Sequence, residues 1–126
     1  MKDWQVKPSL TDIYNKLKSL EKRKLKNVSI RILRNITIHP IEPYIKFYCS
    51  NFGFNSSLNH GNYDAILQDA NNISEDITVI FLTLENFSQN LTYNFHNISE
   101  EQIKIEINHI INYIEATIAS IRKTSQ

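Results

Sequence analysis

The sequence predicts an α/β fold, a three-layer Rossmann-like or flavodoxin-like arrangement built on a short parallel sheet of about three strands. Three isoleucine-rich segments have the length and pattern of buried strands, and segments with apolar residues at helical spacing separate them. Strands that alternate with helices are joined by right-handed crossovers and pair in parallel. The 126 residues, 41% of them hydrophobic, suffice for one domain with a core.

The expected elements follow one another without long gaps. In order they are a helix at 10–25, a strand at 28–34, a helix at 42–51, a strand at 54–58, a helix at 63–70, a strand at 76–83, an asparagine-rich loop at 84–97 and a helix at 99–123. Capping boxes at Ser9–Asp12 and Ser99–Gln102 open the first and last helices. We expect residues 1–26 to form a lead-in segment ahead of an α/β domain at 27–126.

Burial follows from the same pattern. The strand at 76–83 is apolar on both faces, which is typical of a central parallel strand. The helix at 42–51 is expected to bury Phe52 at its end. The last helix carries a continuous isoleucine stripe that should face the sheet, at positions 103, 107, 110, 111, 114, 118 and 121. Three strands are few for so long a stripe, so we expect a truncated domain or one that completes itself by dimerising.

Composition and charge argue against a membrane-spanning, an exported or a nucleic-acid-binding protein. The chain has no run of eighteen apolar residues and no apolar signal core, so we expect a cytoplasmic protein that does not span a membrane. Residues 1–50 carry eleven Lys/Arg against four Asp/Glu, and the remainder carries three against nine. The basic excess at Lys16–Lys26 fits a solvated helix face. Nucleic acid is the less favoured partner, because no recognition motif or interleaved aromatics accompany the charge.

Polar side chains follow the predicted strands at their carboxyl ends, where open α/β sheets hold ligands. Arg34 suits a phosphate or carboxylate, and Thr37 is a nucleophile only if His39 or His60 approaches it. A purely structural interpretation is open for each of these residues: Arg34 as a solvated rim arginine, Thr37 as a capping hydroxyl, and the two histidines as turn residues. The histidines and Cys49 share no metal-ligand spacing, so we expect no metal; two glycines cannot build a dinucleotide loop, so we expect no cofactor.

Three segments resemble the SGNH-hydrolase-like domain at the front of FkbH-like proteins, and they cover only its first half. They are Ile32–Ile45, with a strand running into a polar turn; His60–Asp69, with a Gly-X-Tyr segment; and Val79–Phe87, with a third strand and its turn. The resemblance implies a link to polyketide or polysaccharide biosynthesis. FkbH-like proteins load a phosphorylated three-carbon acid onto an acyl carrier protein.

The resemblance also implies that catalysis is lost. The nucleophilic serine of SGNH hydrolases corresponds to Asn35, whose amide cannot accept an acyl group. Gly61 matches the oxyanion-hole glycine, and the family's asparagine falls on Glu85 or Asn86. The family's late Asp-X-X-His segment would lie beyond Gln126, and the phosphatase Asp-X-Asp pattern is not in the sequence.

We therefore expect a non-catalytic domain that binds an acyl or phosphorylated-acid group, a carrier protein or a partner enzyme. Its candidate site residues, including Tyr63 from the Gly-X-Tyr segment, are Arg34, Asn35, Thr37, His39, His60, Gly61, Tyr63, Glu85 and Asn86. The first alternative is an esterase or acyltransferase that needs a second chain or a missing half. The second alternative is a basic interaction module that uses the lead-in helix.

Overall fold

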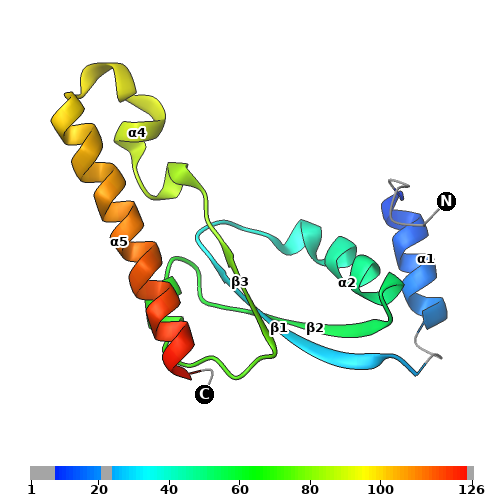
Figure 1. Cartoon of the computed structure of the whole chain (residues 1–126). Coiled ribbons are helices and arrows are strands. Elements are labelled where there is room, and N and C mark those ends of the chain that lie inside the picture. Colours follow the sequence, from blue (N-terminus) through cyan, green and yellow to red (C-terminus); the bar gives the residue numbers. More distant parts are fainter. Residues whose placement is uncertain (1–7, 21–23, 125–126) are drawn as a thin grey trace.

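Three parallel strands form a single sheet in the computed structural model, which describes residues 8–20 and 24–124 (Figure 1). The strands are β1 (Lys26–Arg34), β2 (Phe54–His60) and β3 (Ile77–Phe81), and their order across the sheet is β2-β1-β3. β1 pairs in parallel with both neighbours, so that Ile32 lies opposite His60 on one side and Val79 on the other. The predicted α/β class with a three-stranded parallel sheet is confirmed.

Helices connect the strands in the predicted order. The α-helices are α1 (Leu10–Leu20), α2 (Glu42–Asn51), α3 (Ile66–Asp69), α4 (Gln89–Tyr93) and α5 (Glu100–Thr124), and the 3-10 turns are η2 (His39–Ile41), η3 (Leu84–Asn86) and η4 (Phe95–Asn97). The predicted loop at 84–97 thus contains three short helical segments. The first helix was expected to reach residue 25, but Lys24 and Leu25 are not helical and 21–23 lie outside the described residues.

The two faces of the sheet bury two apolar clusters. On one face Ile30 and Ile32 pack with Ile38 and the apolar side of α2. On the other face Leu33 packs with Ile66, Ala70 and Ile73, against which residues of β3 and α5 also rest. Because neighbouring strand residues point to opposite faces, the run Ile32–Leu33 serves both clusters. This gives the three layers, with α1 and α2 at one end of the molecule and α5 at the other (Figure 1).

Three burial predictions are wrong. β3 is an edge strand, because β1 takes the centre of the sheet, and Ile77, Val79 and Phe81 are exposed. The α5 stripe is not buried along its length: Ile107, Ile111 and Ile118 are exposed, as is Ile105. Phe52 is 70% exposed, because it lies beyond the last turn of α2.

Of the two predicted capping boxes, the first is complete and the second is formed only in part. Ser9 N donates to Asp12 Oδ2 and Asp12 N donates to Ser9 Oγ, each at 3.2 Å, which completes the first capping box. In the second capping box, the backbone N–H of Gln102 donates to Ser99 Oγ. The side-chain amide of Gln102 donates to Glu106 instead, so only half of the box is formed. Gly53 ends α2 with φ +86°, a conformation that favours glycine. None of the described helices is both long and apolar enough to cross a membrane.

Candidate functional site

Asn35 lies at the carboxyl edge of the sheet and ties β1 to the segment after β3. Its amide Nδ2 donates to the Thr83 carbonyl at 3.1 Å, and its Oδ1 accepts from the Thr83 N–H at 2.9 Å. The Asn86 amide donates to the Asn35 carbonyl and lies 3.5 Å from the Tyr63 hydroxyl. Asn35 is 1% exposed, and both ends of its amide are hydrogen-bonded to Thr83. The side chain therefore joins two strand ends and does not face a ligand.

Gly61 allows a close approach of backbone and side chains just after β2. Its N–H donates to the Ile32 carbonyl at 2.9 Å, and a Cβ at this position would lie 2.7 Å from Asp69 Oδ2. The Asp69 carboxylate in turn accepts from the Asn62 N–H at 2.6 Å and from the Asn62 amide at 3.2 Å. The geometry thus gives Gly61 a structural reason to be glycine.

The remaining candidate site residues are spread along the carboxyl edge of the sheet. Arg34 donates through a guanidinium nitrogen to the Ile36 carbonyl at 3.0 Å, which closes the turn after β1. Thr37, Tyr63 and Glu85 are exposed. Arg34, Asn35, Asn86 and Tyr63 therefore occupy one edge, as the parallel sheet predicts, and their use as a ligand site stays a prediction.

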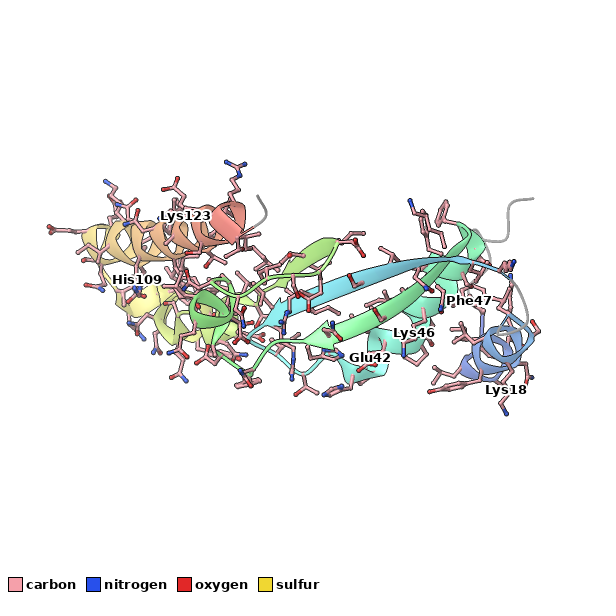
Figure 2. All side chains as sticks on the ribbon, turned by 90° about the horizontal axis from the view of Figure 1, so that it is seen from below. Lys18, Glu42, Lys46, Phe47, His109 and Lys123 are labelled. Carbon is pink, nitrogen blue, oxygen red and sulfur yellow. The ribbon has the colours of Figure 1, made fainter. Side chains whose placement is uncertain are left out.

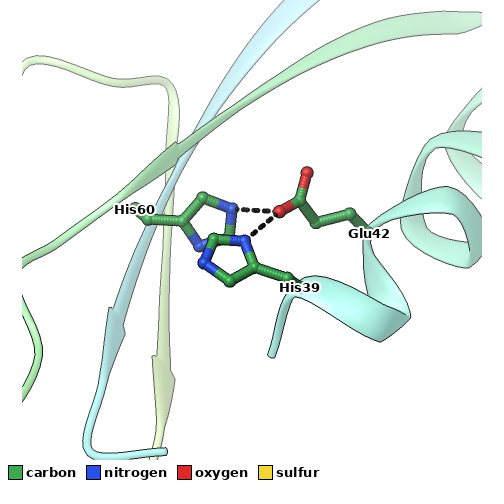
Figure 3. Close-up of side chains that lie close together, drawn as sticks. All are labelled: His39, Glu42 and His60. Atoms are coloured by element: carbon green, nitrogen blue, oxygen red, sulfur yellow. Dashed lines mark hydrogen bonds and ion pairs between the residues drawn. The ribbon is translucent and has the colours of Figure 1, made fainter. Parts of the chain in front are cut away.

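His39 and His60 come together around a residue that the sequence analysis did not single out, Glu42 (Figure 3). His39 belongs to η2, Glu42 to the first turn of α2 and His60 to the end of β2. Glu42 Oε1 lies 2.7 Å from His39 Nδ1 and 2.8 Å from His60 Nε2. The two imidazole rings are 4.8 Å apart, centre to centre. This histidine–glutamate cluster is also at the carboxyl edge of the sheet, on its β2 side.

The electrostatics of the cluster favour an ionised Glu42. The hydrogen bond from His39 lowers the pKa of the Glu42 carboxyl below its ordinary value, and the positive charges that His60 and His39 can carry lower it further. Partial burial opposes these effects and is outweighed. The side chains of Glu42 and His60 are mostly buried, whereas His39 is 58% exposed.

A groove of about 690 Å³ starts at this cluster and runs along α2. Glu42, Lys46 and Ser50 line one wall, because residues four apart lie on the same face of a helix. Figure 2 shows Glu42 and Lys46 on α2. The other walls come from α1, the segment that follows it and the starts of β1 and β2, through Tyr14, Leu17, Leu20, Lys24, Leu25, Asn27, Phe54, Asn55 and Ser56. The groove combines an apolar helix surface with two lysine ammonium groups and several amides and hydroxyls.

Three residues that line the groove were not predicted as site residues, and the reason is the same for each. Glu42, Lys46 and Lys24 each look like ordinary solvated helix or linker charges when they are considered one at a time. The spacing of Glu42, Lys46 and Ser50 was a usable signal, because it predicts a polar stripe on one face of α2. Nothing along the chain indicates that this stripe faces α1 across a groove.

Comparison with known proteins supports the fold and goes no further. No protein-family model matches the chain, and no curated protein is significantly similar to it. A solved structure, the N-terminal part of protein BF1531 from Bacteroides fragilis, which contains a phosphatase domain complexed with Mg, matches with a TM-score of 0.61 at 11% identity. The match covers 87% of this chain and 30% of that one. The chain therefore shares its α/β fold with less than a third of that structure.

Proposed function

We propose that this chain is a non-catalytic, SGNH-like binding module of the FkbH-like type, which holds an anionic acyl or phosphorylated-acid group in the groove beside α2. The observation that carries this proposal is the groove itself. Its volume of about 690 Å³ is in the range typical of small-molecule sites, roughly 300–1,000 Å³. Lys24 and Lys46 supply two positive charges to it against the one negative charge of Glu42, and ammonium groups bind phosphate and carboxylate oxygens.

The non-catalytic part of the proposal is argued from Asn35. An SGNH hydrolase needs a nucleophilic hydroxyl at the position that Asn35 takes in the resemblance, and here a buried amide makes two hydrogen bonds to Thr83. An esterase completed by a second chain is the alternative. Turnover of a short nitrophenyl ester by the purified chain, or on adding a candidate partner, would favour that alternative over a binding module.

A role in polyketide or polysaccharide biosynthesis is the finer part of the proposal. It rests on the three segments that resemble FkbH-like proteins, Ile32–Ile45, His60–Asp69 and Val79–Phe87. The solved structure that matches, at 11% identity, supports the fold alone. In such a role the groove would receive a phosphorylated three-carbon acid, or the acyl-bearing arm of a carrier protein. Both ligands are anionic at one end and extended, which suits a groove with lysines and a long helix wall.

Chemical-shift mapping tests the proposal directly. We expect 3-phosphoglycerate, and separately an acyl carrier protein, to shift the amide resonances of groove residues such as Lys46 and Ser50. Lys46→Gln should weaken binding of the phosphorylated acid by about tenfold, the loss of one charge-assisted contact of roughly 1.5 kcal/mol. Lys104→Gln on α5 is the matched control, because it removes the same charge far from the groove.

The same spectra distinguish binding in the groove from binding at the carboxyl edge of the sheet, where the candidate residues predicted from the sequence lie. Shifts centred on Arg34, Thr37, Tyr63 and Glu85 would place the ligand at the edge predicted from the sequence, with Lys46→Gln having no effect. Shifts confined to α5, or none at millimolar ligand, would overturn the proposed binding function.

A further inference from the structure

Three side chains place metal-ligating atoms within a small volume at the carboxyl edge of the sheet. His39 Nδ1, Glu42 Oε1 and His60 Nε2 all lie within 4.8 Å of one another (Figure 3). Each comes from a different element, η2, α2 and β2, and the first two follow each other directly. A strand end and the first turn of a helix hold positions more firmly than a loop does, so the three groups are arranged before any ligand arrives.

One carboxylate oxygen contacts both imidazoles of the cluster. His39 Nδ1 makes a hydrogen bond to Glu42 Oε1 at 2.7 Å. His60 Nε2 lies 2.8 Å from the same oxygen, as an ion pair when the ring is protonated. The other ring nitrogen, His60 Nδ1, has no hydrogen-bond partner among the described residues, although the side chain is only 17% exposed. Two imidazoles that converge on one carboxylate oxygen place three ligand atoms close together, as a metal ion requires.

We propose that His39, Glu42 and His60 bind a divalent transition-metal ion, with Zn²⁺ as the best fit. Two imidazoles and one carboxylate are a ligand set that Zn²⁺ uses when it keeps a fourth position open. Mg²⁺ and Ca²⁺ prefer oxygen ligands, and this cluster offers a single carboxylate.

The two separations that involve Glu42 are close to those that a metal requires. Tetrahedral ligands about 2.0–2.1 Å from zinc lie about 3.3 Å from one another. The distances from Glu42 Oε1 to the two histidine nitrogens are 2.7 and 2.8 Å. Each must therefore open by roughly half an ångström, which rotation of the exposed His39 ring and of the Glu42 carboxylate can supply.

The open position of such a site would face the groove, because His39 and Glu42 both line it. A carboxylate or phosphate group at that end of the groove could then complete the coordination of the metal. This second step rests on the proposed binding function, whereas the metal site itself does not. The two therefore need separate measurements.

Metal binding is tested on the untagged full chain with Zn²⁺ and Co²⁺ alone. We expect one ion per chain by calorimetry, and for Co²⁺ a visible absorption band of tetrahedral intensity. His39→Ala, Glu42→Gln and His60→Ala should each weaken binding by at least about tenfold. His96→Ala, His109→Ala and Cys49→Ser are the matched controls and should bind as the unmodified chain does.

A second measurement needs no substitution and so remains decisive if a variant fails to fold. In imidazole ¹⁵N spectra, Zn²⁺ should shift the resonances of His39 Nδ1 and His60 Nε2 and leave those of His96 and His109 in place. No stoichiometric binding, shifts at the control histidines, or unchanged affinity in all three variants would overturn the metal site.

The link to the groove is tested by measuring 3-phosphoglycerate affinity with and without Zn²⁺. Tighter binding in the presence of Zn²⁺, lost in Glu42→Gln, supports a shared site. Zinc binding with an unchanged phosphorylated-acid affinity would overturn the link and leave the metal site standing. Phosphorylated-acid binding without zinc binding would overturn both the metal site and the link, and would leave the proposed binding function standing.

Discussion

Gly61 is a residue whose identity is set by its neighbours. A Cβ there would lie 2.7 Å from Asp69 Oδ2 and 3.2 Å from Leu33 Cδ2, so Gly61→Ala should lower the free energy of unfolding by about 1–3 kcal/mol. Urea denaturation measures this. Asp69→Ala removes the nearest atom, so the double variant should lose less stability than the sum of the two single changes. Additive losses would show that the carboxylate contact is not the cause.

Asn35 offers a sharper test, because its amide donates and accepts at once. Asn35→Ala leaves the N–H and the carbonyl of Thr83 without their side-chain partner, which should cost about 2–4 kcal/mol by urea denaturation. Asn35→Asp should cost more at neutral pH, since it places a buried carboxylate against a carbonyl. Asn108→Ala, on the exposed surface of α5, is the control and should stay within about 0.5 kcal/mol.

The ionised state of Glu42 should make stability depend on pH. Its pKa in the folded chain is lowered, chiefly by the His39 hydrogen bond, from an ordinary value of 4.5. A lowered pKa contributes stability above pH 4.5 that is lost as the pH falls through the folded value. The urea midpoint should therefore fall between pH 5 and pH 3, and it should fall less in Glu42→Gln. Equal slopes in the two proteins would contradict this assignment.

At the scale of elements, α5 is anchored by only part of its length. Tyr113 and Ile121 rest on the cluster around Leu33 and Ile66, while Ile111 remains 46% exposed. Ile111→Ser should therefore change the free energy of unfolding by about 0.5 kcal/mol or less. Ile66→Ala, at a side chain that is 1% exposed, should cost about 2–5 kcal/mol. Equal losses would mean that the whole stripe is covered in solution.

Sequence patterns are sufficient to locate most of these elements but not to determine how they pack. Alternating and continuous apolar runs locate β1, β2 and β3, and capping residues locate the helix starts, because both signals are local. Strand order is not local. β3 has apolar residues on both faces whether its open face is covered or not, so the run 77–81 could not show that β3 lies at the edge. The isoleucine period of α5 likewise marks one face without saying how far the packing extends.

In the candidate site too, the local features could be predicted from the sequence and the contacts between distant segments could not. The turn positions of His39, His60 and Gly61 could be predicted, because each follows a strand. The pairing of the histidines through Glu42 could not be predicted, since Glu42 and His60 are eighteen positions apart and belong to different elements. The groove depends on how α1 packs against α2, which no single segment encodes.

At the scale of the whole molecule, the exposed face of β3 should promote self-association. Ile77, Val79 and Phe81 lie side by side along an edge strand, and apolar edge strands pair readily with other chains. We expect a concentration-dependent dimer in sedimentation equilibrium, weakened by at least about tenfold in Val79→Lys. Ile105→Lys is the control, since it places the same charge on the exposed side of α5. A monomer at all concentrations would refute this expectation.

The stripe of Glu42, Lys46 and Ser50 also bears on the size of what the groove accepts. The nine residues of α-helix from position 42 to position 50 span about 12 Å, and Lys46 lies midway along them. A ligand whose anionic group is held by Lys46 would therefore lie extended along the helix wall of the groove. Slender ligands of matching reach should outcompete compact rings of equal charge.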